Sequence, residues 1–86
     1  MAHYLIQASY ATEAIAALVK NPEDRAAVVR RLAQGMGGRV EAFYFAFGDY
    51  DVVAIAELPD NVSMAALSMA IAATGALKTF KTTVLI

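Results

Sequence analysis

The chain has 86 residues, no cysteine and a formal net charge of −1. This composition excludes a disulfide framework and thiolate chemistry, and it lacks the basic surface on which nucleic-acid binding depends. Hydrophobic residues make up 59% of the sequence and charged residues 17%, against roughly 45–50% and 25% in a typical globular domain. A domain of this length leaves much of its surface exposed, and with so few charged residues that surface would be largely apolar. The composition therefore predicts that the protein associates with itself.

The sequence shows no targeting or membrane-spanning segment. Its amino terminus lacks the basic and long apolar regions of a signal peptide. The apolar run over residues 64–73 is shorter than the about 20 residues that a transmembrane helix needs. We therefore expect a single domain over residues 1–86 that is cytoplasmic and does not bind membranes.

The first part of the chain predicts a strand followed by two helical segments. Residues 3–10 alternate in the manner of a strand, and Thr12 after them is a typical helix N-cap residue. Asn21 and Pro22 restart the helical pattern, since proline is common at the first position of a helix. We expect a short helix, a break, and a longer helix from Pro22 to about Gln34.

A β-hairpin from Val40 to Glu57 forms the centre of the predicted fold. Aromatic and β-branched residues lie on both sides of Gly48, which is a strong hairpin signal. Strands are expected over residues 39–47 and 50–58. Gly48 is expected at positive φ, because glycine adopts that conformation without steric cost.

The last part of the chain predicts a helix and a strand. A helix over residues 61–74, capped by Asp60 or Asn61, is apolar on nearly every side and is therefore predicted to be buried on every side. Residues 76–86 have the pattern of a last strand. The order β-α-β-β-α-β is that of a ferredoxin-like α+β fold, with a four-stranded antiparallel sheet and two helices on one face.

Strict alternation along each strand separates the two faces of the predicted sheet. The sets expected to face the helices are Tyr4, Ile6, Ala8 and Tyr10; Val40, Ala42, Tyr44 and Ala46; Val52, Ala54 and Ala56; and Phe80, Thr82, Val84 and Ile86. The opposite face then mixes polar residues with Phe43, Phe45 and Phe47. Three phenylalanines on a free sheet face are typical of an interface or a ligand groove.

The hairpin carries a motif that resembles the signature of the GYD-domain family. The motif runs through Phe47-Gly48-Asp49-Tyr50-Asp51-Val52-Val53 and continues with Glu57-Leu58-Pro59-Asp60. The upstream segment 37–45 and the downstream pair Thr74-Gly75 fit the same pattern, so the resemblance covers nearly the whole chain. It implies a bacterial or archaeal protein with a dimeric α/β-barrel fold, in which two ferredoxin-like sheets pack face to face. It implies no particular activity.

The candidate catalytic residues are Glu57, Asp51 and His3, all predicted on the mixed face of the sheet. Glu57 ends an otherwise apolar strand, where partial burial would raise its pKa and suit it to general acid or base catalysis. The alternatives are an ion pair with a base such as Lys81 or a solvated strand end. His3 is the only histidine and, without cysteines or clustered carboxylates, it does not indicate a metal site.

The candidate ligand-binding residues are Gln7, Phe43, Phe45, Tyr50 and Lys81. Tyr50 and Asp51 have two interpretations. Either they line the mouth of a cleft, or Tyr50 packs on the helices while Asp51 bonds the backbone, as short polar side chains at turns commonly do. The sequence contains no phosphate-binding loop, dinucleotide-binding fingerprint or nucleophile motif, so no cofactor is expected.

Two functions are consistent with these observations. The first is a homo-oligomeric binding or structural module that holds a small apolar or amphipathic ligand in a cleft between the sheet and its partner. The alternative, by analogy with relatives of the barrel fold, is a cofactor-free enzyme of isomerase or small-oxygenase type that transfers protons through Glu57, Asp51 or His3. An enclosed cavity with Glu57 or Asp51 directed inward beside His3 would favour the enzyme.

Overall fold

The computed structural model describes residues 1–20, 25–46 and 48–86. Its elements in chain order are β1 (Ala2–Tyr10), α1 (Thr12–Lys20), α2 (Arg25–Gly35), β2 (Arg39–Phe45), β3 (Val52–Leu58), α3 (Asn61–Ala72) and β4 (Leu77–Leu85). The predicted β-α-β-β-α-β order is confirmed, with the first helical region divided into two helices. The expected helix start at Pro22 and the placement of Phe47 lie outside the described residues.

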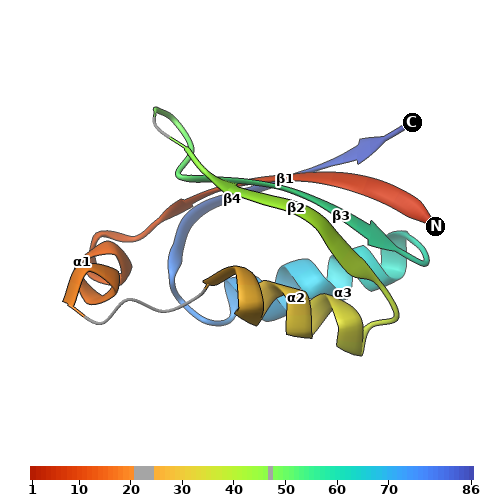
Figure 1. Cartoon of the computed structure of the whole chain (residues 1–86), viewed down its shortest axis with the longest axis horizontal. Helices are drawn as coiled ribbons and strands as arrows, with labels where there is room; N and C mark the ends of the chain where they lie inside the picture. Colours follow the sequence, from red (N-terminus) through yellow and green to blue (C-terminus); the bar gives the residue numbers. More distant parts are fainter. Residues whose placement is uncertain (21–24, 47) are drawn as a thin grey trace.

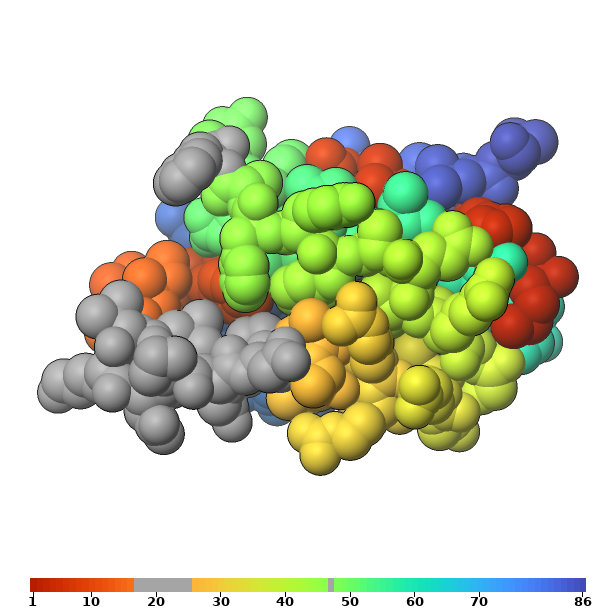
Figure 2. All heavy atoms as spheres, in the orientation of Figure 1, coloured from red at the N-terminus to blue at the C-terminus, as the bar shows by residue number. Residues whose placement is uncertain are grey.

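The four strands form one antiparallel sheet in the order β2-β3-β1-β4. α2 and α3 run beneath one face of this sheet, whereas α1 lies beyond its end (Figure 1). The edge strand β2 packs on α2, and its residues lie above those of α2 in the space-filling view (Figure 2).

No described helix covers the opposite face of the sheet (Figure 1), which we call the open face. The strand register assigns the residues of this face. They are His3, Leu5, Gln7 and Ser9 of β1; Val53, Ile55 and Glu57 of β3; Arg39, Ala42 and Tyr44 of β2; and Thr79, Lys81, Thr83 and Leu85 of β4.

The core lies between the sheet and the helices α2 and α3. The buried residues are Tyr4, Ile6, Ala8, Tyr10, Ala33, Val52, Ala54, Ala56, Leu58, Met64, Leu67 and Ile71. The predicted helix-facing sets of β1 and β3 are thereby confirmed. The Tyr4 hydroxyl donates a 2.6 Å hydrogen bond to Asn61 Oδ1, which gives this buried side chain a polar partner and joins β1 to the start of α3.

Two predicted local structures are also confirmed. Asp60 caps α3, because its Oδ1 accepts a 2.8 Å hydrogen bond from the backbone N–H of Ser63. The same hydrogen bond lowers the pKa of Asp60. Gly48 has a φ of 106° between β2 and β3, a conformation that other residues rarely adopt.

A β-bulge in β2 reverses the predicted faces of its aromatic residues. Pairing passes from Val40 opposite Ala56 to Ala42 opposite Ile55, so that Glu41 is an extra residue in the strand. Beyond the bulge, Phe43 pairs with Ala54 and therefore lies on the helix side, whereas Tyr44 pairs with Val53 on the open face. The strict alternation predicted for β2 is wrong from this point, because one extra residue shifts every later side chain to the other face.

Phe45 follows Phe43 to the helix side, opposite Val52. The two rings meet edge to face with centroids 5.6 Å apart. Phe45 nevertheless remains 66% exposed, because it lies at the end of an edge strand. The predicted phenylalanine ridge on the open face therefore does not form from these two residues.

α3 is buried on only one side within a single chain. Met64, Leu67 and Ile71 face the sheet, whereas Val62 and Met69 on the outer side are 78% and 72% exposed. One chain thus buries only the sheet side of α3, and burial of the outer side, which requires a partner, stays a prediction. Neither α3 nor any other helix in the described part of the chain has the length and hydropathy needed to cross a membrane.

Candidate functional site

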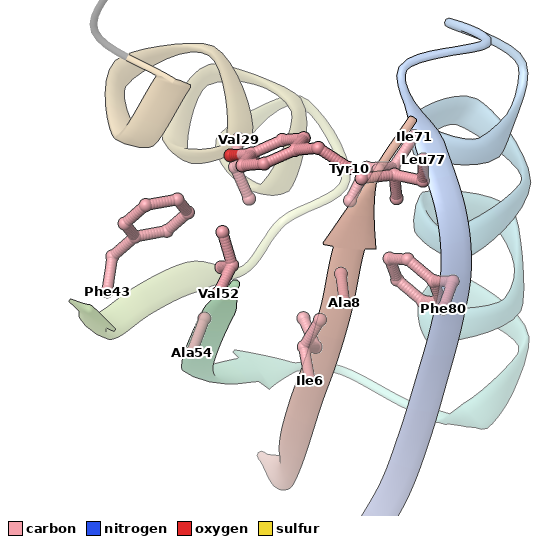
Figure 3. A pocket seen from close by; sticks show the side chains of 10 residues that line it. All are labelled: Ile6, Ala8, Tyr10, Val29, Phe43, Val52, Ala54, Ile71, Leu77 and Phe80. Atoms are coloured by element: carbon pink, nitrogen blue, oxygen red, sulfur yellow. The ribbon is translucent and has the colours of Figure 1, made fainter. Parts of the chain in front are cut away.

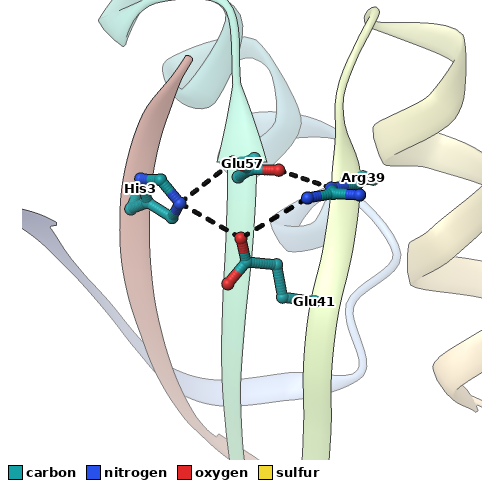
Figure 4. A network of polar contacts seen from close by, with 4 residues as sticks. All are labelled: His3, Arg39, Glu41 and Glu57. Atoms are coloured by element: carbon teal, nitrogen blue, oxygen red, sulfur yellow. Dashed lines mark hydrogen bonds and ion pairs between the residues drawn. The ribbon is translucent and has the colours of Figure 1, made fainter.

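Three charged or titratable residues form a row across the open face, near the end of the sheet that carries the amino terminus. His3 of β1 and Arg39 of β2 are the cross-strand partners of Glu57 on β3, one on each side. Glu41, the extra residue of the bulge, reaches the same group. Figure 4 shows the four side chains converging above the three strands; we call them the polar quartet.

The carboxylate of Glu57 bridges the two outer strands through different oxygens. Its Oε1 lies 2.9 Å from His3 Nε2, and its Oε2 accepts a hydrogen bond from Arg39 Nε. Glu41 Oε1 lies 3.1 Å from the same His3 nitrogen and 3.9 Å from Arg39 Nη2. Two carboxylate oxygens therefore converge on one imidazole nitrogen.

The electrostatics of Glu57 differ from the sequence-based prediction. Its side chain is only 14% exposed, yet its pKa is lowered, chiefly by the Arg39 hydrogen bond and also by the charges of Arg39, His3 and the amino terminus, which together outweigh desolvation. The expected rise of the pKa is therefore wrong. A carboxylate held ionised in this way is a poor general acid and a weak general base at neutral pH.

Asp51 lies at the opposite end of β3, six residues from Glu57 and thus roughly 20 Å away at about 3.3 Å per residue. Its Oδ2 accepts a 2.9 Å hydrogen bond from the backbone N–H of Tyr10. Its own backbone N–H donates to the carbonyl of Ala8, and its carbonyl accepts from the N–H of Ala46. This geometry matches the backbone-bonding interpretation of Asp51. Tyr50 beside it is half-buried.

The remaining polar candidates lie between these two ends of the open face. Gln7 and Lys81 are cross-strand partners on β1 and β4, four residues along β1 from His3. Lys81 is therefore not the base that pairs with Glu57, and Arg39 takes that place. The candidate residues predicted from the sequence did not include Arg39 and Glu41, because only the register and the bulge reveal that they meet His3 and Glu57.

The sheet has a small cavity on its helix side, away from the polar quartet. Its volume is about 40 Å³, and Figure 3 shows its side chains closing around it. The residues that line it are Ile6, Ala8, Tyr10, Val29, Phe43, Val52, Ala54, Ile71, Leu77 and Phe80, and none of these is charged. Neither Glu57 nor Asp51 is directed into it beside His3, so the geometry that would favour an enzyme is not found in the described part of the chain.

A larger and more open groove of about 270 Å³ separates α3 from β4. It is lined by Tyr4, Asn61, Met64, Ala65, Ser68, Thr82 and Val84. The exposed outer side of α3 continues from this groove through Ala65.

The fold defines the chain as a ferredoxin-like α+β domain, and solved structures share it. The crystal structure of FFRP-DM1 matches with a TM-score of 0.64 at 18% identity over 100% of both chains. The crystal structure of MtbAldR matches with a TM-score of 0.67 at 16% identity, over 99% of this chain and 51% of that chain. At these identities the likeness shows the fold alone.

Within this fold class, the chain belongs to the GYD-domain family, whose model matches residues 4–86. The motif around Gly48 predicted membership of this family, and the match confirms it. A relative from Thermus thermophilus, named "Glutamine synthetase and cystathionine beta-lyase binding protein", is 32% identical over 79 residues, which cover 92% of this chain and 83% of the relative.

Proposed function

We propose that this GYD-domain protein is a homodimeric binding module. Two copies pair through their open faces, as in a dimeric α/β barrel, and the outer side of α3 binds a partner enzyme. The observation that carries the proposal is the apolar centre of the open face, formed by Leu5, Val53, Ile55 and Tyr44. No described helix lies over this face of the sheet (Figure 1). Tyr44 is 67% exposed and the other three side chains are half-buried, so pairing would bury the surface they still expose and add only a fraction of the about 1.5–3 kcal/mol that full burial of such a side chain contributes.

The outer side of α3 supplies the second surface. Five residues there are exposed although none is charged, and they are Val62, Ala65, Ala66, Met69 and Ala72. An exposed apolar stripe of this kind is typical of a protein interaction site. The name of the Thermus thermophilus relative supports enzymes as the partners.

The pairing is tested by comparing Ile55→Lys with Val62→Lys, which place the same charge on the two surfaces. Native mass spectrometry of the wild type should give the mass of a dimer. Ile55→Lys should shift the protein to monomer, and Tyr44→Ala, at an exposed position, should weaken the dimer while retaining the fold. Val62→Lys should keep the dimer mass. A wild type that is monomeric at micromolar concentration would overturn the pairing.

Binding to purified glutamine synthetase and cystathionine β-lyase tests the second surface. We expect the wild type to bind at least one of these enzymes, and Val62→Lys to lose that binding while it remains dimeric. Retained binding in Val62→Lys would rule out the outer side of α3 as the contact. Failure of the wild type to bind either enzyme would rule out these partners. A small apolar or amphipathic ligand between the paired sheets stays a prediction, and the mass spectrum of freshly purified protein tests it.

A further inference from the structure

In the polar quartet, two carboxylate oxygens from different strands converge on one imidazole nitrogen. His3 Nε2 lies 2.9 Å from Glu57 Oε1 and 3.1 Å from Glu41 Oε1. An imidazole nitrogen carries a single N–H or a single lone pair. The ring nitrogen forms a hydrogen bond with Glu41 Oε1, whereas its short contact with Glu57 Oε1 is an ion pair. A single N–H cannot be directed well at both oxygens, but a cation placed among the three atoms would bond all of them.

The spacing of these three atoms fits one metal ion. They all lie within 4.8 Å of one another. Tetrahedral zinc with ligand distances of about 2.0–2.2 Å separates its donor atoms by about 3.3–3.6 Å. His3 and Glu41 are partly exposed, so their side chains can open the two short distances by the few tenths of an ångström that this requires.

The surroundings of Glu57 also fit a ligand role. Arg39 donates to Oε2 of Glu57 and leaves Oε1 directed at His3 (Figure 4). Metal-binding carboxylates are commonly oriented in this way by a hydrogen bond to the oxygen that does not bind the metal. The two glutamates and Arg39 carry a net charge of −1. This negative charge attracts a divalent cation to the group.

We propose that His3, Glu41 and Glu57 bind one divalent transition-metal ion of the zinc type on the open face. One imidazole and two carboxylates supply three ligands, and the remaining coordination position is open to water or to a ligand. A mixed nitrogen and oxygen donor set selects zinc or cobalt over magnesium, which prefers oxygen ligands and retains its water. All three ligands come from one chain, so the site does not require the proposed dimer, although it lies on the face through which the two copies would pair.

The test is calorimetric titration of tag-free, metal-free protein with zinc chloride, together with the visible spectrum of the cobalt-loaded protein. We expect one ion per chain and the absorption bands of low-coordinate cobalt. Glu41→Gln should weaken zinc binding about tenfold or more, and His3→Ala should do the same and abolish the cobalt bands. Glu41 belongs to no regular cross-strand pair, so its variant should keep the fold, as circular dichroism would verify.

Glu13→Gln is the matched control. It makes the same chemical change at an exposed residue of α1 and should leave zinc binding unchanged. Equal weakening in Glu13→Gln and Glu41→Gln would show scattered surface binding and overturn the proposal. So would an absence of zinc binding to the wild type at submillimolar concentration, or zinc binding that His3→Ala leaves intact. Displacement of zinc by millimolar magnesium would overturn the assigned metal class.

Discussion

Arg39 and Glu57 face one another across β2 and β3, and the Arg39 Nε donates to Oε2 of Glu57. Because the other oxygen of Glu57 contacts His3, one carboxylate links three neighbouring strands. The opposite end of β3 is joined to β1 differently, through the hydrogen bond from the Tyr10 backbone to Asp51. The acidic residues at the two ends of β3 thus have different roles, since one meets other side chains and the other bonds the backbone.

The Arg39 contact predicts a pH dependence of stability. The folded pKa of Glu57 lies below its ordinary value of 4.5, so the ionised group stabilises the fold above pH 4.5 and this contribution is lost as the pH falls through the folded pKa. In Arg39→Gln the pKa of Glu57 should rise. The difference in unfolding free energy between wild type and variant should be greatest above pH 4.5 and should shrink in acid.

Carboxyl NMR titration and urea unfolding at several pH values measure the two quantities. Arg31→Gln removes an exposed arginine on α2 and should leave the Glu57 titration unchanged. A Glu57 pKa that is the same in Arg39→Gln and in the wild type would contradict the assignment of the Arg39 hydrogen bond as the main cause.

A second prediction concerns Gly35, the last residue of α2, and Gly38, which directly precedes β2. A Cβ on Gly38 would overlap the backbone oxygen of Glu57 and the side chain of Leu58, whereas a Cβ on Gly35 would meet nothing within 4 Å. Gly38→Ala should therefore push β2 away from β3 and destabilise the protein by about 1–3 kcal/mol. Gly35→Ala should be neutral or slightly stabilising, because alanine favours helix. Urea midpoints that are equal in the two variants would show that β2 does not approach β3 so closely.

A third prediction tests the bulge in β2. Phe43 packs against both parts of the core, so Phe43→Ala should reduce the free energy of unfolding by about 2–3 kcal/mol, somewhat less than for a fully buried ring. Phe45→Ala should cost about 1 kcal/mol or less, from loss of the edge-to-face contact. Chemical unfolding measures both values. A larger loss in Phe45→Ala than in Phe43→Ala would contradict the register.

The sequence predicts the order of the elements and the faces of β1 and β3, because alternation in those strands is uninterrupted and each helix-facing set is apolar. The turn at Gly48 and the cap at Asp60 are predictable for a similar reason, since each depends on a few adjacent residues. β2 is different. Apolar and aromatic residues occupy both of its faces, so hydrophobicity alone does not reveal the extra residue at Glu41.

The polar quartet depends on contacts between strands that are distant in sequence. The sequence places His3, Arg39, Glu41 and Glu57 on one face, but which of them meet depends on the register of three strands. The direction of the Glu57 pKa shift then depends on whether a guanidinium or only apolar atoms lie beside it. The sequence allows two interpretations of Asp51, and only the position of the Tyr10 backbone distinguishes them.

The bulge at Glu41 also bears on how this family can diverge. Without Glu41 the ladder would be regular, because Val40 and Ala42 already lie opposite the adjacent residues Ala56 and Ile55. Insertion or deletion of this one residue therefore adds or removes an acidic group beside His3. Because the bulge absorbs the extra residue, each aromatic side chain of β2 stays on the same face of the sheet. Over evolutionary time, the charge of this surface can vary by one insertion or deletion while the core is inherited intact.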